Sequence, residues 1–140
     1  MTRNIDRLTR VRDAIATETL PEGIDKFRMD IWRDQFHTCG TAACIGGLAQ
    51  TFMEAEQGPV EPDEEFTLTA DWLGLNSEPY LANHLFCPTP SGIYQKYSDR
   101  SVFWKTITPA EAVGALNILI EGGKPAELIK YWEGVLNERL

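Results

Sequence analysis

The organisation of this chain is decided by one short stretch, Thr38-Cys39-Gly40-Thr41-Ala42-Ala43-Cys44-Ile45-Gly46-Gly47. Thr41 is of a residue type that caps helices, because its hydroxyl accepts a hydrogen bond from an unpaired backbone N–H of the first turn. Apolar residues follow at helical spacing, so the stretch predicts a helix over about 42–55. Gly46 and Gly47 each cost about 1 kcal/mol relative to alanine inside a helix. Their presence predicts that another part of the backbone approaches closely.

Clear helical signals lie on both sides of this stretch. Apolar side chains recur at steps of three and four residues from Ile5 to Ile15, which predicts an amphipathic helix over 4–19. Thr108-Pro109-Ala110-Glu111 is a capping box with proline at the first helical position, and it predicts a helix that Gly122-Gly123 ends. Pro125 then opens a last helix.

The elements between these helices carry weaker signals. Shorter helices are predicted over 69–74 and 78–86, the second with Asn76 or Ser77 as its cap. Alternating apolar and polar residues near 26–32 predict one short extended segment. The acidic run over 54–65 contains Gly58, Pro59 and Pro62, and it predicts a solvated loop.

These patterns together predict a mainly α fold, a compact helical bundle of about five to six helices. The chain has 140 residues, and no long linker or internal repeat divides it. We therefore expect a single helical domain over 1–140.

Charge and composition exclude several classes of function. The formal net charge is −8, so direct binding to nucleic acid or to an anionic membrane is not expected, since both depend on lysine and arginine. No apolar run is long enough to span a bilayer, and no secretory signal is visible. An odd number of cysteines without such a signal predicts reduced thiols and a cytoplasmic protein.

Cys44 is the candidate catalytic nucleophile. With Thr41 as the cap, Cys44 stands at the third helical position, where unpaired N–H groups and the helix dipole favour a thiolate. A thiol enzyme pairs such a cysteine with a histidine base, and His37 and His84 are the two histidines of the chain. The alternative is that Cys44 is an inert core thiol.

A structural zinc site is a second alternative. His37, Cys39, Cys44, His84 and Cys87 supply enough soft or borderline ligands for tetrahedral zinc. Their spacing lacks the paired Cys-x-x-Cys pattern of the common zinc modules, so no metal and no cofactor is favoured.

The same stretch also predicts a binding surface. Backbone N–H groups at a helix start can cradle an anion, and small residues let another backbone come close. Tryptophans most often anchor cores or interfaces. The predicted binding residues are Trp32, Gly40, Thr41, Ala42, Ala43, Gly46 and Gly47.

Several motifs follow one another along the chain: Trp32, the run from Cys39 to Ala49, Trp72-Leu73-Gly74-Leu75, Leu85-Phe86 and Thr108-Pro109-Ala110-Glu111-Ala112. Their order resembles that in a group of small hypothetical proteins from bacteria and their phages. That group carries a Cys-Gly-Thr-x-Ala-Cys-Ile-small-Gly motif, then a Leu-Gly-Leu element and a Thr-Pro-Ala helix. The resemblance covers about residues 27–119. It implies a shared organisation and no particular activity.

The sequence therefore favours a small binding or regulatory protein of bacterial or phage origin that acts through contact with another protein. Small size, acidic charge, aromatic content and the lack of a complete catalytic set support this expectation over catalysis. The thiol enzyme and the zinc protein remain the alternatives.

Overall fold

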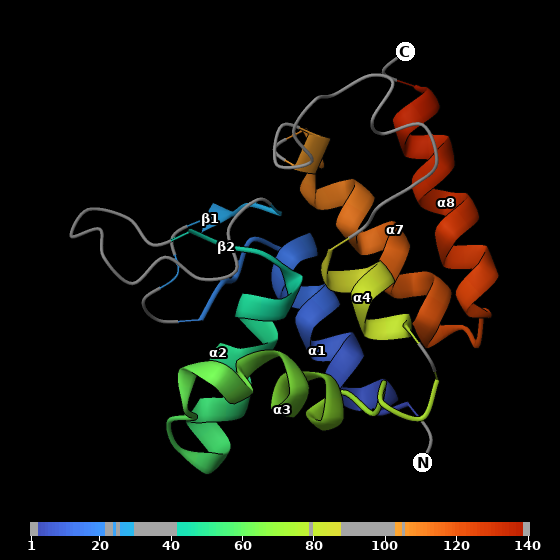
Figure 1. Ribbon diagram of the computed structural model, residues 1–140. Coiled ribbons are helices and arrows are strands. Elements are labelled where there is room, and N and C mark those ends of the chain that lie inside the picture. The colour runs from blue at the N-terminus through green and yellow to red at the C-terminus, as the bar shows by residue number, and fades with distance from the viewer. Residues whose placement is uncertain are drawn as a thin grey trace.

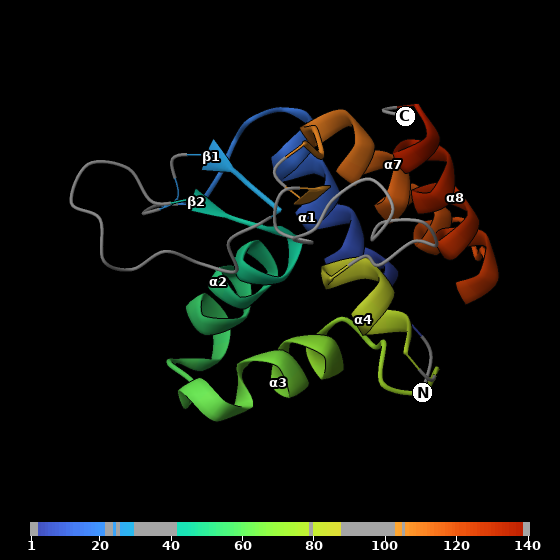
Figure 2. The same ribbon diagram turned by 45° about the horizontal axis from the view of Figure 1, so that its top comes forward.

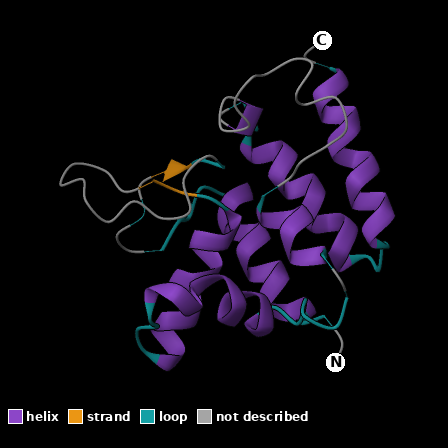
Figure 3. Ribbon diagram, in the orientation of Figure 1, coloured by secondary structure: helices purple, strands orange, loops and turns teal. Residues whose placement is uncertain are grey.

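The computed structural model describes residues 3–21, 24, 26–29, 42–78, 80–87, 103–104 and 106–138. These residues form a mainly helical fold, as the sequence predicts (Figures 1 and 3). The helices and strands in chain order are α1 (Ile5–Ala16), β1 (Lys26–Phe27), β2 (Ala42–Ala43), α2 (Ile45–Gln57), the short 3-10 helix η1 (Pro62–Glu64), α3 (Glu65–Trp72), α4 (Leu81–Phe86), α7 (Pro109–Ile120) and α8 (Pro125–Asn137). None of these helices combines the length and the apolar character that a membrane-spanning helix needs.

Helix α1 lies at the centre of the arrangement. It packs along α7 on one side and contacts α2 on the other, while α8 covers α7 and also reaches α4 (Figures 1 and 2). The residues of α1 that face this core, Leu8, Val11 and Ile15, are at most 2% exposed. Burial of a full aliphatic side chain contributes roughly 1.5–3 kcal/mol. The apolar stripe of α1 therefore stabilises the packing of α7 on one side and of α2 on the other.

The strong local signals produce the predicted helices. Asn4 caps α1, and its side-chain oxygen accepts a hydrogen bond from the N–H of Arg7 at 3.1 Å. The capping box of α7 is complete, since Thr108 and Glu111 exchange hydrogen bonds of 3.2 and 2.9 Å. Pro125 stands in the first turn of α8. These three helices begin within two residues of the predicted positions because their start signals are local.

The start of α2 differs from the prediction. Ala42 and Ala43 are extended and pair in parallel with Lys26 and Phe27, so the helix begins only at Ile45. Cys44 takes the N-cap position, and Thr41 lies outside the described residues. Of the predicted extended segment near 26–32, Lys26 and Phe27 form β1, and residues 30–32 lie outside the described residues. Backbone pairing with β1 therefore replaces the helical turn that the local signal favoured.

The region from 54 to 81 also differs. α2 continues to Gln57 and α3 begins at Glu65, so the acidic loop is shorter than predicted. α4 begins at Leu81 and not at residue 78. Glu78 precedes a proline, and a residue in that position is disfavoured in the helical conformation. This steric rule is the sequence signal that argues against the earlier helix start.

The contact between α7 and α8 depends on one glycine. A Cβ atom at Gly114 would collide with the hydroxyl of Tyr131, which donates a hydrogen bond to the carbonyl oxygen of Glu111 at 2.7 Å. We expect Gly114→Ala to lower the free energy of unfolding by about 1–3 kcal/mol, because the ring must leave its position. A Cβ atom added at Gly134 of α8 would meet open space among the described residues, so Gly134→Ala is expected to stabilise by about 0.5–1 kcal/mol. Urea unfolding of both variants measures the two changes in the free energy of unfolding, which should have opposite signs. Equal changes would contradict this packing.

Candidate functional site

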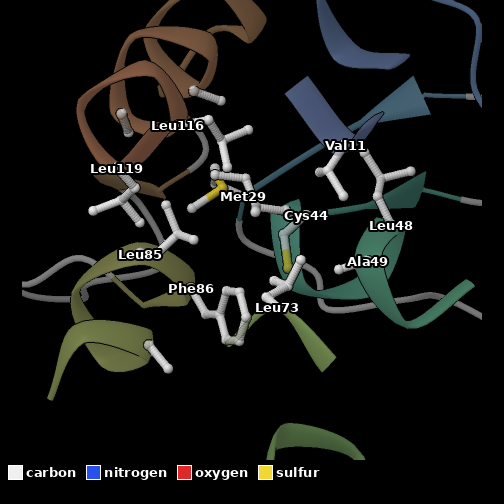
Figure 4. Packing of buried hydrophobic residues seen from close by; sticks show 14 of the residues in the cluster. Val11, Met29, Cys44, Leu48, Ala49, Leu73, Leu85, Phe86, Leu116 and Leu119 are labelled. Atoms are coloured by element: carbon white, nitrogen blue, oxygen red, sulfur yellow. The ribbon is translucent and has the colours of Figure 1, made fainter. Parts of the chain in front are cut away.

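Cys44 lies inside the core at the start of α2. Its exposed fraction is 2%, and its sulfur is surrounded by apolar side chains that include Leu48, Ala49 and Leu73 (Figure 4). A nucleophile must reach its substrate as a thiolate, which needs access and a lowered pKa. The buried position of Cys44 denies it that access.

Electrostatics at Cys44 point in the same direction. Burial raises the pKa of the Cys44 thiol to about 12, although the backbone N–H groups of Gly46 and Gly47 act to lower it. The nearby Cys87 raises it further. The helix start that was expected to activate this thiol is present, but loss of water around the sulfur is the larger effect. Cys44 is therefore a protonated core thiol at neutral pH.

This assignment predicts slow alkylation of Cys44. In the folded protein at pH 8 we expect iodoacetamide to modify Cys44 at least about a thousandfold more slowly than a free cysteine, because so little thiolate is present. Cys87 is only half-buried and serves as the internal comparison. Peptide mass mapping with and without denaturant measures both rates. Native-state labelling of Cys44 as fast as that of Cys87 would contradict the assignment.

His84, the proposed base, lies half-buried on α4. Burial lowers the pKa of its imidazole, because the charged ring is less well solvated there. Among the described residues, the thiol that influences the pKa of Cys44 is that of Cys87, and the His84 ring does not contribute. The backbone carbonyl of His84 accepts a hydrogen bond from the indole of Trp132 at 2.8 Å. This contact joins α4 to α8, so the backbone at His84 contributes to packing.

The predicted metal ligands are only partly described. Cys44, His84 and Cys87 belong to the described residues, and within these no cluster of three or more His, Cys, Asp or Glu side chains is placed to hold a metal ion. His37 and Cys39 lie outside them. The described residues therefore add no support to the zinc alternative.

The predicted binding stretch is divided between two structural roles. Ala42 and Ala43 pair with β1, and Gly46 and Gly47 are buried in the first turn of α2. The other predicted binding residues lie outside the described part of the chain, namely Trp32, Gly40 and Thr41. The described residues of the stretch therefore serve the fold.

A different surface stands out around the start of α1. Among the described residues, the large apolar side chains that remain exposed are Ile5 (40%), Leu68 (37%) and Tyr80 (73%). They belong to the start of α1, to α3 and to the residue before α4, and hydrogen bonds link the segments next to them. We call this surface the Tyr80 end.

Long-range polar contacts hold the Tyr80 end together. The guanidinium of Arg3 donates two hydrogen bonds of 2.7 Å to the carboxylate of Glu78, two residues before Tyr80. The backbone N–H of Asn4 donates to the carbonyl of Leu73, just after α3, at 2.9 Å. The segments that carry the three exposed side chains are thus fixed relative to one another.

Tyr80 itself has an unusual backbone conformation. Its φ angle is 62°, in the left-handed region, and its side chain caps no backbone group of α4. A residue other than glycine in this region costs of order 1–3 kcal/mol, and such strain gathers at functional sites. The conformation holds a large aromatic side chain out in solvent. The helix predicted over 78–86 would have placed Tyr80 within its first turns, so no local pattern marked this residue as part of a site.

Acidic side chains flank Leu68, the exposed apolar residue of α3. Glu64 and Asp71 stand four residues before and three residues after Leu68, on the same side of the helix, and both are exposed. No lysine or arginine occurs between Arg33 and Lys96 in the sequence. Of the arginines of α1 near this region, Arg7 is already engaged, since it stacks over Trp72 at 4.6 Å and lies 3.8 Å from Glu56.

Comparison with protein-family models, with curated proteins and with solved structures found no match to this chain. The basis for assigning a function is therefore the geometry and chemistry of its own residues.

Proposed function

We propose that this protein is a small binding or regulatory protein of bacterial or phage origin that acts in the cytoplasm through contact with another protein. The Tyr80 end is the contact surface. The origin rests on the resemblance of its motifs to small bacterial and phage proteins. The reduced thiols of Cys44 and Cys87 support a reducing compartment.

One observation carries the proposal. Tyr80 is 73% exposed and is held there by a left-handed backbone, although burying its ring would be favourable. Tyrosine is among the residues that most often dominate binding energy at protein interfaces. Strain that keeps such a ring in solvent is a cost to stability, and contact with a partner supplies the reason to keep it.

The charges around the Tyr80 end specify the partner's chemistry. Leu68 lies between exposed carboxylates, and the positive charge of Arg7 on α1 is engaged within the protein. The partner surface should therefore offer an apolar recess for Tyr80 with lysine or arginine at its rim. Electrostatic attraction of this kind speeds association and weakens with salt.

Catalysis by Cys44 has less support. Its thiol is buried and protonated, and its pKa is raised where a nucleophile needs it lowered. The alkylation experiment tests this alternative separately.

The proposal is tested with wild-type protein and the Tyr80→Ala variant as matched baits. We expect a partner that forms a complex of defined stoichiometry with the wild type, and an affinity at least about tenfold weaker with Tyr80→Ala. Tyr80→Phe should keep most of the binding, and Lys130→Ala on α8 should keep all of it. Complexes are measured with purified components by calorimetry at two salt concentrations.

Two outcomes would overturn the proposal. One is a protein that remains an inert monomer with every candidate partner. The other is a partner that binds wild type and Tyr80→Ala equally well. Circular dichroism of each variant verifies that a loss of binding is not a loss of fold.

A further inference from the structure

A pocket of about 320 Å³ lies at the far end of α1 from Tyr80. Its described lining comes from the end of α1 and the turn after it, from β1 and from the first residue of α7. The described lining residues are Ile15, Glu18, Leu20, Lys26, Phe27 and Pro109. Ligand pockets in proteins span roughly 300–1,000 Å³, so this one lies at the small end of that range and suits a small metabolite.

Four of the six described lining residues are apolar. Ile15 is 2% exposed, and Leu20 and Phe27 are half-buried and pack against the core. Pro109 adds a rigid ring from the first turn of α7. This wall suits one small aliphatic or aromatic group.

Two opposite charges belong to the described lining of the pocket. Glu18 and Lys26 are both exposed, and within the described residues neither side chain makes a hydrogen bond or an ion pair, with each other or elsewhere. Ion pairs of the described residues, such as Arg3 with Glu78, lie elsewhere in the fold. The pocket thus offers one acceptor of an ammonium group and one donor to a carboxylate beside an apolar wall.

The backbone at Glu18 adds a second observation. Its φ angle is 56°, in the left-handed region, and its N–H donates to the carbonyl of Ile15 at 3.3 Å. Left-handed non-glycine residues are strained and persist where the surrounding structure holds them in place. Here the strained residue is the one that places a carboxylate on the pocket.

We propose that this pocket binds a free α-amino acid with an apolar side chain. The carboxylate of Glu18 receives the ammonium group, the ammonium of Lys26 receives the carboxylate, and the side chain lies against the apolar wall. A fatty acid would leave Glu18 without a counter-charge, and a simple amine would leave Lys26 without one. A zwitterion is the class of ligand that satisfies both charges and the apolar wall together.

The test uses the whole protein and four small probes. L-leucine carries all three recognised groups, 4-methylpentanoate lacks the ammonium, 3-methylbutylamine lacks the carboxylate, and glycine lacks the side chain. We expect leucine to bind at one site, and each of the other three to bind at least about tenfold more weakly. Calorimetry gives the affinities, and amide chemical shifts locate the site at residues 15–27 and 109.

Two variants connect each charge to one end of the ligand. Glu18→Gln should weaken leucine about tenfold and leave 4-methylpentanoate unchanged, and Lys26→Gln should weaken leucine and leave 3-methylbutylamine unchanged. Lys130→Gln on α8 is the matched control. The substituted side chains are exposed, so the fold should persist.

Three results would overturn the proposal. The first is that leucine, methionine and phenylalanine all fail to bind at about 10 mM, a concentration that would reveal even a weak site. The second is that 4-methylpentanoate or 3-methylbutylamine binds as tightly as leucine. The third is a leucine affinity that neither charge variant changes, since an apolar side chain of a partner protein would then be the better occupant. None of these outcomes depends on Tyr80, so they stand apart from the test of the protein contact.

Discussion

Replacing Trp132 with alanine is expected to lower the free energy of unfolding by about 3–5 kcal/mol, which is a large part of the stability of a domain this size. Trp132 lies on α8, is 1% exposed, and its indole N–H donates to the carbonyl of His84 on α4 at 2.8 Å. Its ring also contacts that of Tyr131 edge to face, with 5.4 Å between centroids. One side chain therefore fills the core and joins α8 to α4.

The Trp132→Phe variant separates the two contributions. Phenylalanine keeps most of the apolar contact but has no N–H, so the carbonyl of His84 loses its donor. We expect an intermediate loss of about 1–3 kcal/mol, the usual cost of leaving a buried polar group unpaired together with a small cavity. Guanidinium unfolding of both variants measures the difference. A loss below about 1 kcal/mol for Trp132→Ala would show that this site is not part of the cooperative core.

The second large effect is expected at Arg3. Its side chain is 11% exposed, binds both carboxylate oxygens of Glu78, and donates a third hydrogen bond to the carbonyl of Leu119 at the end of α7 at 3.1 Å. Arg3→Met removes all three contacts and retains much of the aliphatic length. We expect a loss of about 2–3 kcal/mol, because charged hydrogen bonds with this geometry are stronger than neutral ones, although the partial exposure of Glu78 limits their strength.

This pair also predicts a pH dependence. The hydrogen bonds from Arg3 lower the pKa of Glu78 below its ordinary value of 4.5, while burial acts in the opposite direction. A carboxyl whose pKa is lowered on folding contributes stability above its unfolded pKa and loses it as pH falls through the folded value. The stability difference between wild type and Arg3→Met should therefore be constant near neutral pH and shrink below the ordinary pKa of 4.5.

Glu78→Gln is the matched variant for that experiment. It keeps the shape of the side chain and removes the charge, so its stability should lack the same acid-dependent component. Thermal unfolding from neutral pH down through the titration range of carboxyl groups follows all three proteins. A difference between wild type and Arg3→Met that stays the same at every pH would contradict the pairing. The same variants report on the proposed contact surface, since Glu78 holds the turn that carries Tyr80.

Three helices were predictable from the sequence because their causes lie within a few residues. Apolar spacing marked α1, whose cap Asn4 is seen in the structure, the capping box at Thr108 and Glu111 starts α7, and Pro125 opens α8. The apolar periodicity also identified the buried face of α1 from Leu8 to Ile15, whereas Ile5, the first residue of that pattern, remains 40% exposed. Such signals act through neighbouring backbone groups, so no knowledge of the rest of the fold is needed.

The candidate sites were much less predictable. The local signals at Cys44, a cap at Thr41 and a dipole at the helix start, do not include two distant contributions. Pairing of β2 with β1 moved the helix start to Ile45, and packing of other helices over the sulfur raised its pKa. A pKa depends on what surrounds a group in space, which spacing in the sequence does not report.

The sequence by itself thus determined the helical class and the starts of α1, α7 and α8, whereas α1 ends at Ala16 and not at residue 19. The tertiary structure alone decided where α2 begins, that Cys44 is a core thiol, and that Tyr80 remains in solvent. The physical reason is the range of the interactions. Caps and periodicity act over three or four residues, whereas the bond from Arg3 to Glu78 spans 75 positions and exists only once the chain has folded.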